Sequence, residues 1–255
     1  MISKIKKYWF VFCELVKRDF KKKYKRTYLG MLWSVLSPLL TLLVMRLVFT
    51  QFFGRGMDHY TTYLFCGNIV FSFFSDSTGR GMGSLLSNSA IFTKVNIPKY
   101  IFVFSTEVSA LINFGLTFLV FLIFCIIDGV ALTPMFLLLI FPIFCLIVFN
   151  VGVSFILSAL LVFFRDIQYL WGVFTQLLMY MSAIFYNVSQ LSDTVQRLFL
   201  LNPIYVYIDY FRTIVLEGQL PSLLHHVLAL GYALAVFGIG ALIYKTKNHK
   251  FLYYV

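Results

Sequence analysis

The sequence contains few charged residues. Asp, Glu, Lys and Arg together make up 12% of its 255 residues, whereas 60% of the residues are hydrophobic and the mean hydropathy is +0.87. A soluble domain of this length could not bury so many apolar side chains, so the composition excludes a soluble globular protein. We therefore predict an all-α integral membrane protein that crosses the bilayer several times.

The sequence also lacks the residue patterns of several kinds of binding site. It contains no Gly-x-x-x-x-Gly-Lys-Ser/Thr, so it cannot cradle ATP in a P-loop, and its four cysteines show no C-x-x-C spacing. We expect these cysteines to be buried free thiols. The acidic residues between the apolar segments are widely spaced, which argues against a membrane enzyme. We predict no catalytic residue, no metal site and no cofactor bound by this chain.

The first 25 residues carry too many charges for a cleavable signal peptide, and no small-residue cleavage site follows them. No soluble domain, internal repeat or low-complexity segment interrupts the apolar segments that come next. We expect an amphipathic interface helix over residues 1–30 and a single six-span transmembrane domain over residues 31–255.

Six apolar segments are long enough to cross a membrane, for which about 20 residues are needed. The second contains a run of polar residues between Ser72 and Gly79, so we expect it to face protein or water. The fourth is too long for one straight crossing. Its Pro134, Pro142 and Asn150 predict a tilted, kinked or broken helix, or an interfacial piece leading into it. The predicted spans are 32–53, 62–86, 102–127, 133–163, 169–187 and 222–244.

Lysine and arginine residues gather on one side of the predicted spans. Residues 1–30 hold ten of the 21, and Lys94, Lys99, Arg165 and the tail lie on the same side. The positive-inside rule places that side, and both termini, in the cytoplasm. The net charge of +11 is therefore a signal of membrane topology, and nucleic-acid binding is not indicated because the basic residues flank spans.

The amino-terminal segment has apolar residues at three- and four-residue steps, among them Tyr8, Phe12 and Leu15, with lysines on the remaining face. This pattern predicts an amphipathic helix in the cytoplasmic interface. The basic residues have two interpretations, a positive-inside anchor or a cationic collar that gathers phosphate head groups. The candidate head-group contacts are Arg18, Lys21, Lys25, Arg26 and Trp33.

A short loop between the second and third spans, residues 89–99, carries apolar residues outside any span. It predicts a brief amphipathic helix that Pro98 ends. Because Ile91, Phe92, Val95 and Ile97 need an apolar cover, a soluble partner that docks from the cytosol is the natural candidate.

Four charged residues lie in or near the spans, where an unpaired charge is costly. Asp76 and Arg80 are four residues apart with the acid first, the better order for an ion pair within a helix. We prefer a structural pair to a substrate contact, and Glu107 could join it. Arg46 has no obvious partner in the sequence.

Residues 188–221, on the predicted outer side, are too apolar for a solvated loop. We expect one or two short helices that dip into the outer leaflet, turned at Asn202-Pro203 and ended near Gly218 and Pro221. Aromatic residues make up 19% of the chain, and a subset that lined a conduit would suit sugars. The candidate lining and gate residues are Phe71, Phe74, Asp76, Arg80, Tyr180, Tyr186, Asn202, Pro203 and Tyr205.

Several short motifs, in order, resemble the type 2 ABC transporter permeases that export O-antigen, teichoic acid and capsular polysaccharide. The resemblance covers nearly the whole chain, although the Phe-rich third and fourth spans depart from the family pattern. The motifs are Arg18-Asp19 with Tyr24-Lys25, Leu29-Gly30 with Trp33 and Pro38, the loop from Ile91 to Lys99, Phe164-Arg-Asp-Ile167, and Asn202-Pro203 followed by Arg212.

The resemblance implies a homodimer in the bacterial or archaeal inner membrane, with two copies of a cytoplasmic P-loop ATPase that binds ATP and Mg. It further implies that residues 89–99 form a coupling helix, that residues 188–221 form an outer gate, and that the substrate is a polysaccharide on polyprenyl pyrophosphate. The implied ATPase contacts are Ile91, Phe92, Lys94, Val95, Asn96, Ile97, Pro98, Lys99, Arg165 and Asp166.

Other functions remain open at this point. An ABC permease for a drug or a small lipid would share the same architecture. An ion-coupled flippase would carry more spans and matched broken helices, for which the sequence gives no sign.

Overall fold

The computed structural model describes residues 2–24, 28–53, 58–247, 250–252 and 254. Within these ranges all regular structure is helical, as predicted. Lys25 and Arg26, two of the predicted head-group contacts, lie outside the described residues. The elements are α1 (Ile2–Tyr24), η1 (Gly30–Leu32), α2 (Trp33–Phe53), α3 (Tyr60–Ser87), α4 (Ser89–Phe92), α5 (Tyr100–Ile127), η2 (Pro134–Leu139), α6 (Ile140–Phe163), α7 (Ile167–Met181), η3 (Val188–Gln190), α8 (Asp193–Phe199), α9 (Pro203–Val215), α10 (Leu223–Lys247) and η4 (Lys250–Leu252).

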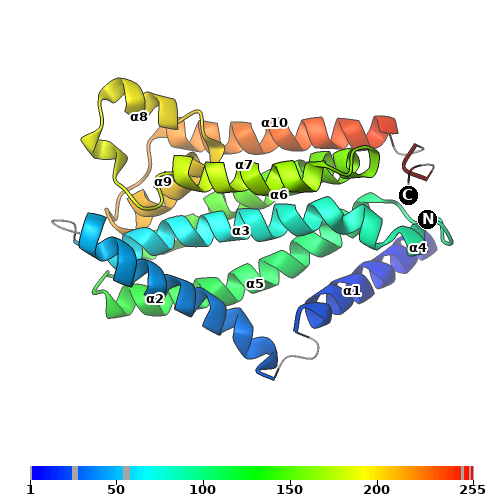
Figure 1. The fold of residues 1–255 in the computed structure, drawn as a ribbon, viewed down its shortest axis with the longest axis horizontal. Coiled ribbons are helices and arrows are strands. Elements are labelled where there is room, and N and C mark those ends of the chain that lie inside the picture. The colour runs from blue at the N-terminus through cyan, green and yellow to red at the C-terminus, as the bar shows by residue number, and fades with distance from the viewer. Residues whose placement is uncertain (1, 25–27, 54–57, 248–249, 253, 255) are drawn as a thin grey trace.

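The long helices run along the longest axis of the molecule (Figure 1). The start of α1, the end of α10 and α4 lie at one end, which we call the terminal end. The short helix α8 lies at the opposite, distal end. Both termini at one end agree with an even number of crossings.

Helix α3 lies at the centre of the bundle. It packs against α5 and α6 and also contacts α2, α7 and α9. Nearly every residue of its first half is buried, including Thr62 and Asn68, and Ser77 is buried further along. The hydroxyl of Thr62 donates to Asp128 Oδ2 at 2.6 Å, and that of Ser77 donates to Glu107. Within the predicted polar run from Ser72 to Gly79, Ser77 and Thr78 are buried by the protein, which is one of the two predicted alternatives, protein or water.

Three segments of the described chain are long and apolar enough to cross a membrane, namely Tyr100–Ile127, Pro134–Phe163 and Leu223–Lys247. A shorter apolar stretch, Trp33–Phe49, lies in α2. Helix α3 has the same length as α5, 28 residues, but a more polar sequence. The six-span count stays a prediction.

Helix α7 is shorter than the predicted fifth span. Its 15 residues extend about 22 Å, less than the roughly 30 Å of a hydrocarbon core. The helix ends at Met181, and Ala183 has a left-handed backbone with φ of 50°, which a continuing helix does not allow. The prediction of one span over residues 169–187 is therefore wrong in its extent.

The long fourth segment is divided, which was one of the predicted forms. The 3₁₀-helix η2 begins at Pro134, and α6 continues from Ile140. Pro142 falls in the first turn of α6, where its missing N–H removes no helical hydrogen bond. Asn150 lies within the continuous helix α6, so the division of the segment is not at this residue.

Residues 188–221 form short helices with a turn at Asn202-Pro203, as predicted. The Asn202 side chain accepts from the backbone N–H of Ile204 at 3.0 Å and caps α9, and Pro203 occupies the first helical position. Gly218, with φ of 60°, follows the end of α9. The depth of this segment in a membrane stays a prediction.

Arg212 of α9 is buried at the junction of three elements, with 5% of its surface exposed. Its guanidinium donates to the carbonyl oxygens of Ala183 at 2.9 Å, Ile184 at 3.0 Å and Tyr63 at 3.4 Å. The guanidinium carbon also lies 3.4 Å from the centre of the Tyr63 ring. One side chain thus joins the start of α3, the turn after α7 and α9.

Helices α6 and α10 form the most extensive helix pair, and small residues allow their close approach. A Cβ atom on Gly152 would lie 2.5 Å from the backbone nitrogen of Phe237. A Cβ on Gly240 would lie 2.6 Å from the carbonyl oxygen of Gly152. Small residues at contacts of this kind are typical of membrane helices, where close van der Waals packing drives association.

Replacing Gly152 by Ala should therefore separate α6 from α10. We expect a loss of about 1–3 kcal/mol of stability, because the added methyl group meets backbone atoms that cannot move aside. Thermal unfolding in mild detergent measures the effect. The matched control is Gly115→Ala on α5, where a Cβ meets nothing within 4 Å. Equal melting temperatures for the two variants would contradict the close-packing argument.

Candidate functional site

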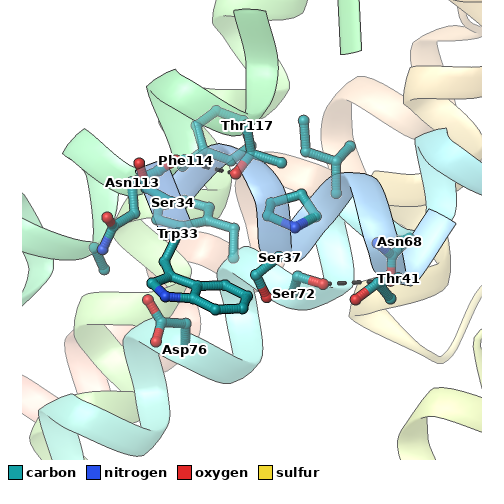
Figure 2. Close-up of a pocket in the computed structure, with 14 residues that line it drawn as sticks. Trp33, Ser34, Ser37, Thr41, Asn68, Ser72, Asp76, Asn113, Phe114 and Thr117 are labelled. Atoms are coloured by element: carbon teal, nitrogen blue, oxygen red, sulfur yellow. Dashed lines mark hydrogen bonds between the residues drawn. The ribbon is translucent and has the colours of Figure 1, made fainter. Parts of the chain in front are cut away.

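A polar cavity lies between α2, α3 and α5 and has a volume of about 570 Å³. Figure 2 shows side chains from all three helices around it, with Trp33 and Asp76 at one end and Thr41 and Asn68 at the other. The Ser72 hydroxyl donates to Asn68 Oδ1 at 3.3 Å. The other polar lining residues are Ser34, Ser37, Asn113 and Thr117.

A second cavity of about 440 Å³ shares Asp76 with the first and continues past Arg80 to Asp19 of α1. The two cavities together are called the polar groove below. The groove places hydrogen-bonding groups among helices that are otherwise apolar. Ionisable residues at membrane depth, such as Asp76 and Arg80, mark the groove as the candidate functional site.

The predicted ion pair between Asp76 and Arg80 is confirmed. Arg80 donates to Asp76 Oδ1 through Nε at 2.9 Å and through Nη2 at 2.7 Å. Glu107 is 3% exposed and accepts from Ser77. We expected that Glu107 could join the pair of Asp76 and Arg80. Its hydrogen bond is with Ser77 instead and gives that expectation no support.

Several predicted lining residues belong instead to the protein core. Phe71 and Phe74 are buried, and the Phe74 ring lies 6.0 Å from that of Phe149 and 5.9 Å from that of Trp171. Tyr205 is likewise buried. Their placement on an open conduit is wrong, because other helices of the same chain cover them.

The remaining lining and gate candidates lie around the turn after α7. Tyr180 is exposed, and the Tyr186 hydroxyl donates to its carbonyl oxygen at 2.9 Å. The Asn202 amide donates to the carbonyl oxygen of Met181 at 3.1 Å, so the start of α9 is tied to the end of α7. Pro203 follows as the first residue of α9. The structure does not bring this group together with Asp76 and Arg80.

The loop of residues 89–99 contains only one helical turn, α4. Phe92 and Ile97 are each 5% exposed and pack in one cluster with Leu15 of α1, Phe102 of α5 and Phe251 of the tail. The apolar cover that these two residues were expected to need comes from the chain itself and not from the partner that was the candidate for it.

A smaller part of the same loop remains open. Thr93, Lys94, Val95 and Asn96 are exposed, whereas Ile91 and Pro98 are partly buried. Arg165 and Asp166 are also exposed, in the turn between α6 and α7 at the terminal end (Figure 1). These side chains form the surface that a partner at this end can contact.

Helix α1 is tied to the start of this loop. Arg18 donates to Asn88 Oδ1 at 2.7 Å, and the Asn88 amide donates to the carbonyl oxygen of Ser84 at 2.8 Å. Arg18 also donates to Asp19 at 2.7 Å, while Lys21 is exposed.

Lys99 is 8% exposed, and burial lowers the pKa of its ammonium group. Of the predicted head-group contacts that the structure describes, Trp33 lines the first cavity.

Two sets of residues escaped the sequence analysis. Ser34, Ser37 and Thr41 recur on one face of α2, and Asn113 and Thr117 are four residues apart on α5. This spacing is a signal for a polar face. Arg212 appeared only as part of a resemblance motif, and its structural role gave no signal because its partners are backbone carbonyl groups.

The described residues form a helical bundle with long apolar helices around a polar groove, which is the architecture expected of a membrane transport subunit. The chain is a member of the ABC-2 type transporter family, whose family model matches residues 11–216. It is therefore a multi-pass membrane permease subunit.

Individual relatives cover most of both chains. The O-antigen export system permease protein RfbA of Myxococcus xanthus is 26% identical over 98% of this chain and 97% of its own length. The protein of the same name from Klebsiella pneumoniae is 26% identical over 81% of this chain and 80% of its own. The polysialic acid transport protein KpsM of Escherichia coli is 22% identical over 92% of each chain.

The loop geometry separates residues that stabilise the fold from residues that face outward. Replacing Phe92 by Asp should lower the melting temperature of the purified chain, because an unpaired carboxylate in an apolar cluster costs several kcal/mol. Val95 lies three residues away and is 39% exposed, so Val95→Asp should leave the melting temperature nearly unchanged. Equal destabilisation by both substitutions would show that the Phe92 cluster is not a core.

Proposed function

We propose that this chain is the permease subunit of an ABC exporter that moves a lipid-linked polysaccharide across the cytoplasmic membrane of a bacterium or archaeon. The observation that carries the proposal is the polar groove, a hydrogen-bonding surface enclosed by apolar helices. The relatives named for O-antigen export and polysialic acid transport support the polysaccharide class of cargo. The lipid carrier is proposed to be polyprenyl pyrophosphate.

The groove has the chemistry that sugars require. Hydroxyl and amide groups such as those of Ser72, Asn68 and Asn113 can exchange hydrogen bonds with a hydroxyl-rich chain. The flat indole of Trp33, at one end of the first cavity, offers an apolar face to a sugar ring. Neutral partners of this kind bind without holding the substrate so firmly that it cannot move on.

The energy comes from a separate ATPase, because this chain has no P-loop of its own. We propose that two ATPase subunits dock at the terminal end and contact the exposed part of the loop, from Thr93 to Asn96, together with Arg165 and Asp166. The hydrogen bond between Arg18 and Asn88 then transmits loop movement to α1. Helix α1 contributes Asp19 to the polar groove, so a movement of α1 would reach the proposed substrate path.

The proposed assembly contains two copies of the permease, with the terminal end in the cytoplasm. Apolar residues suited to lipid or to a second copy remain exposed on α2, such as Leu43 and Leu47, and on α7, such as Val173 and Leu177. Helix α7 has no buried residue at all in the single chain. The segment of residues 188–221 is then placed at the outer face, as a gate.

Replacing Ser72 by Trp tests the groove. The indole fills part of the first cavity, and we expect surface polysaccharide to fall about tenfold or more, the effect of losing about 1.4 kcal/mol of substrate interaction. Ile123→Trp, at an exposed position of α5, is the matched control and should export normally. Normal export by a Ser72→Trp chain that inserts normally would show that the substrate does not pass through the groove. Normal surface polysaccharide after deletion of the gene would exclude polysaccharide as the cargo.

Replacing Val95 by Asp tests the docking surface. An unpaired charge in an apolar contact should reduce the ATPase that co-purifies with the tagged permease by about tenfold, with export falling in parallel. Gln219→Asp adds the same charge to an exposed loop at the distal end and should leave both readouts unchanged. Full ATPase recovery with Val95→Asp would place the docking surface elsewhere.

A further inference from the structure

A third cavity lies at the terminal end of the molecule, away from the polar groove. It has a volume of about 480 Å³ and is bordered by the start of α5 and the end of α10. Phe155 of α6 lies between these two helices, with its ring 5.6 Å from that of Phe104 on α5 and 6.0 Å from that of Phe237 on α10. We call this cavity the α5–α10 groove. Its size is that of a small-molecule site.

The polarity of the α5–α10 groove changes along its length. Lys99, directly before α5, and Lys245, near the end of α10, supply two cations at the terminal end. Ala241 lies about 6 Å deeper along α10 and Phe237 about 12 Å deeper, at 1.5 Å per residue. On the other side of the groove, Phe104 lies about 7 Å from Lys99 along α5. The groove is therefore cationic at its end and apolar inside.

The charge around the groove favours an anion at this end. Lys247 and Lys250 are exposed beyond Lys245, which adds to the positive potential. Lys99 is nearly buried, and its ammonium lies 5.8 Å from the centre of the Phe92 ring and 5.6 Å from that of Phe251. A phosphate group at this end would be attracted by the positive charges of these lysines.

We propose that the α5–α10 groove binds an anionic phospholipid, with its phosphate between Lys99 and Lys245 and an acyl chain along Phe104, Phe155 and Phe237. Basic pockets between membrane helices at a cytoplasmic surface bind acidic head groups in this manner. A soluble phosphate would leave the apolar part of the groove empty, and a neutral lipid would not need two lysines. Because Lys99 also contacts Phe92, the bound lipid steadies the end of the loop of residues 89–99.

The test is lipid retention by the full-length permease, purified with its ATPase, delipidated in detergent and analysed by native mass spectrometry. Added phosphatidylglycerol should remain bound to the wild-type chain, whereas phosphatidylcholine should not. Lys245→Gln should reduce bound phosphatidylglycerol about fivefold, the effect expected of one lysine near an acidic head group. Ala241→Trp should also reduce bound phosphatidylglycerol, because the indole fills the apolar part of the groove. Lys99→Gln should reduce it too, because it removes the other lysine at the proposed phosphate position.

Lys247→Gln is the matched control, since it removes one exposed lysine of the same helix outside the groove. Equal loss with Lys247→Gln would mean a diffuse surface charge and overturn the proposal. Normal binding by Ala241→Trp, or displacement by inorganic phosphate, would also overturn it, as would a preference for polyprenyl pyrophosphate over phosphatidylglycerol. Binding is measured without transport, so the result is independent of the proposed cargo.

Discussion

A polar helix enclosed by apolar ones is the constraint on which this structure depends. In hydrocarbon an unsatisfied polar group costs several kcal/mol, so α3 can lie in a membrane only where other helices cover it. Asp128 of the turn after α5 accepts from Thr62, Glu107 of α5 accepts from Ser77, and Arg212 of α9 donates to the backbone of Tyr63. These contacts explain why α5 and α9 gather around α3 and why their outer faces can remain apolar.

The same constraint produces the candidate path. On the side of α2, the polar side chains of α3 are not fully covered, and the polar groove remains between them and α5. Asp76 lies where the two cavities meet, and its charge is balanced within its own helix by Arg80. A neutralised pair gives the groove polarity without a net charge that would trap an anionic substrate.

Features that depend on local spacing could be predicted from the sequence. The long apolar helices, the turn at Asn202-Pro203 and the pair of Asp76 and Arg80 all rest on residues within a few positions of one another. The burial of Phe92 and Ile97 could not be predicted, because their cover comes from Leu15 and Phe251, which are far away in the chain. The early end of α7 was also missed. Its following turn is bonded to Arg212 through backbone carbonyl groups, which have no signature in a sequence.

The bond between Arg212 and Tyr63 has a consequence for how the protein is made. The two residues are 149 positions apart. At 5–20 residues per second, Tyr63 is synthesised roughly 7–30 s before Arg212. During that interval α5 and α6 are completed, and α9 is added last of the helices that cover α3. The order of synthesis therefore decides which polar groups of α3 are covered first, and it becomes part of the folding pathway.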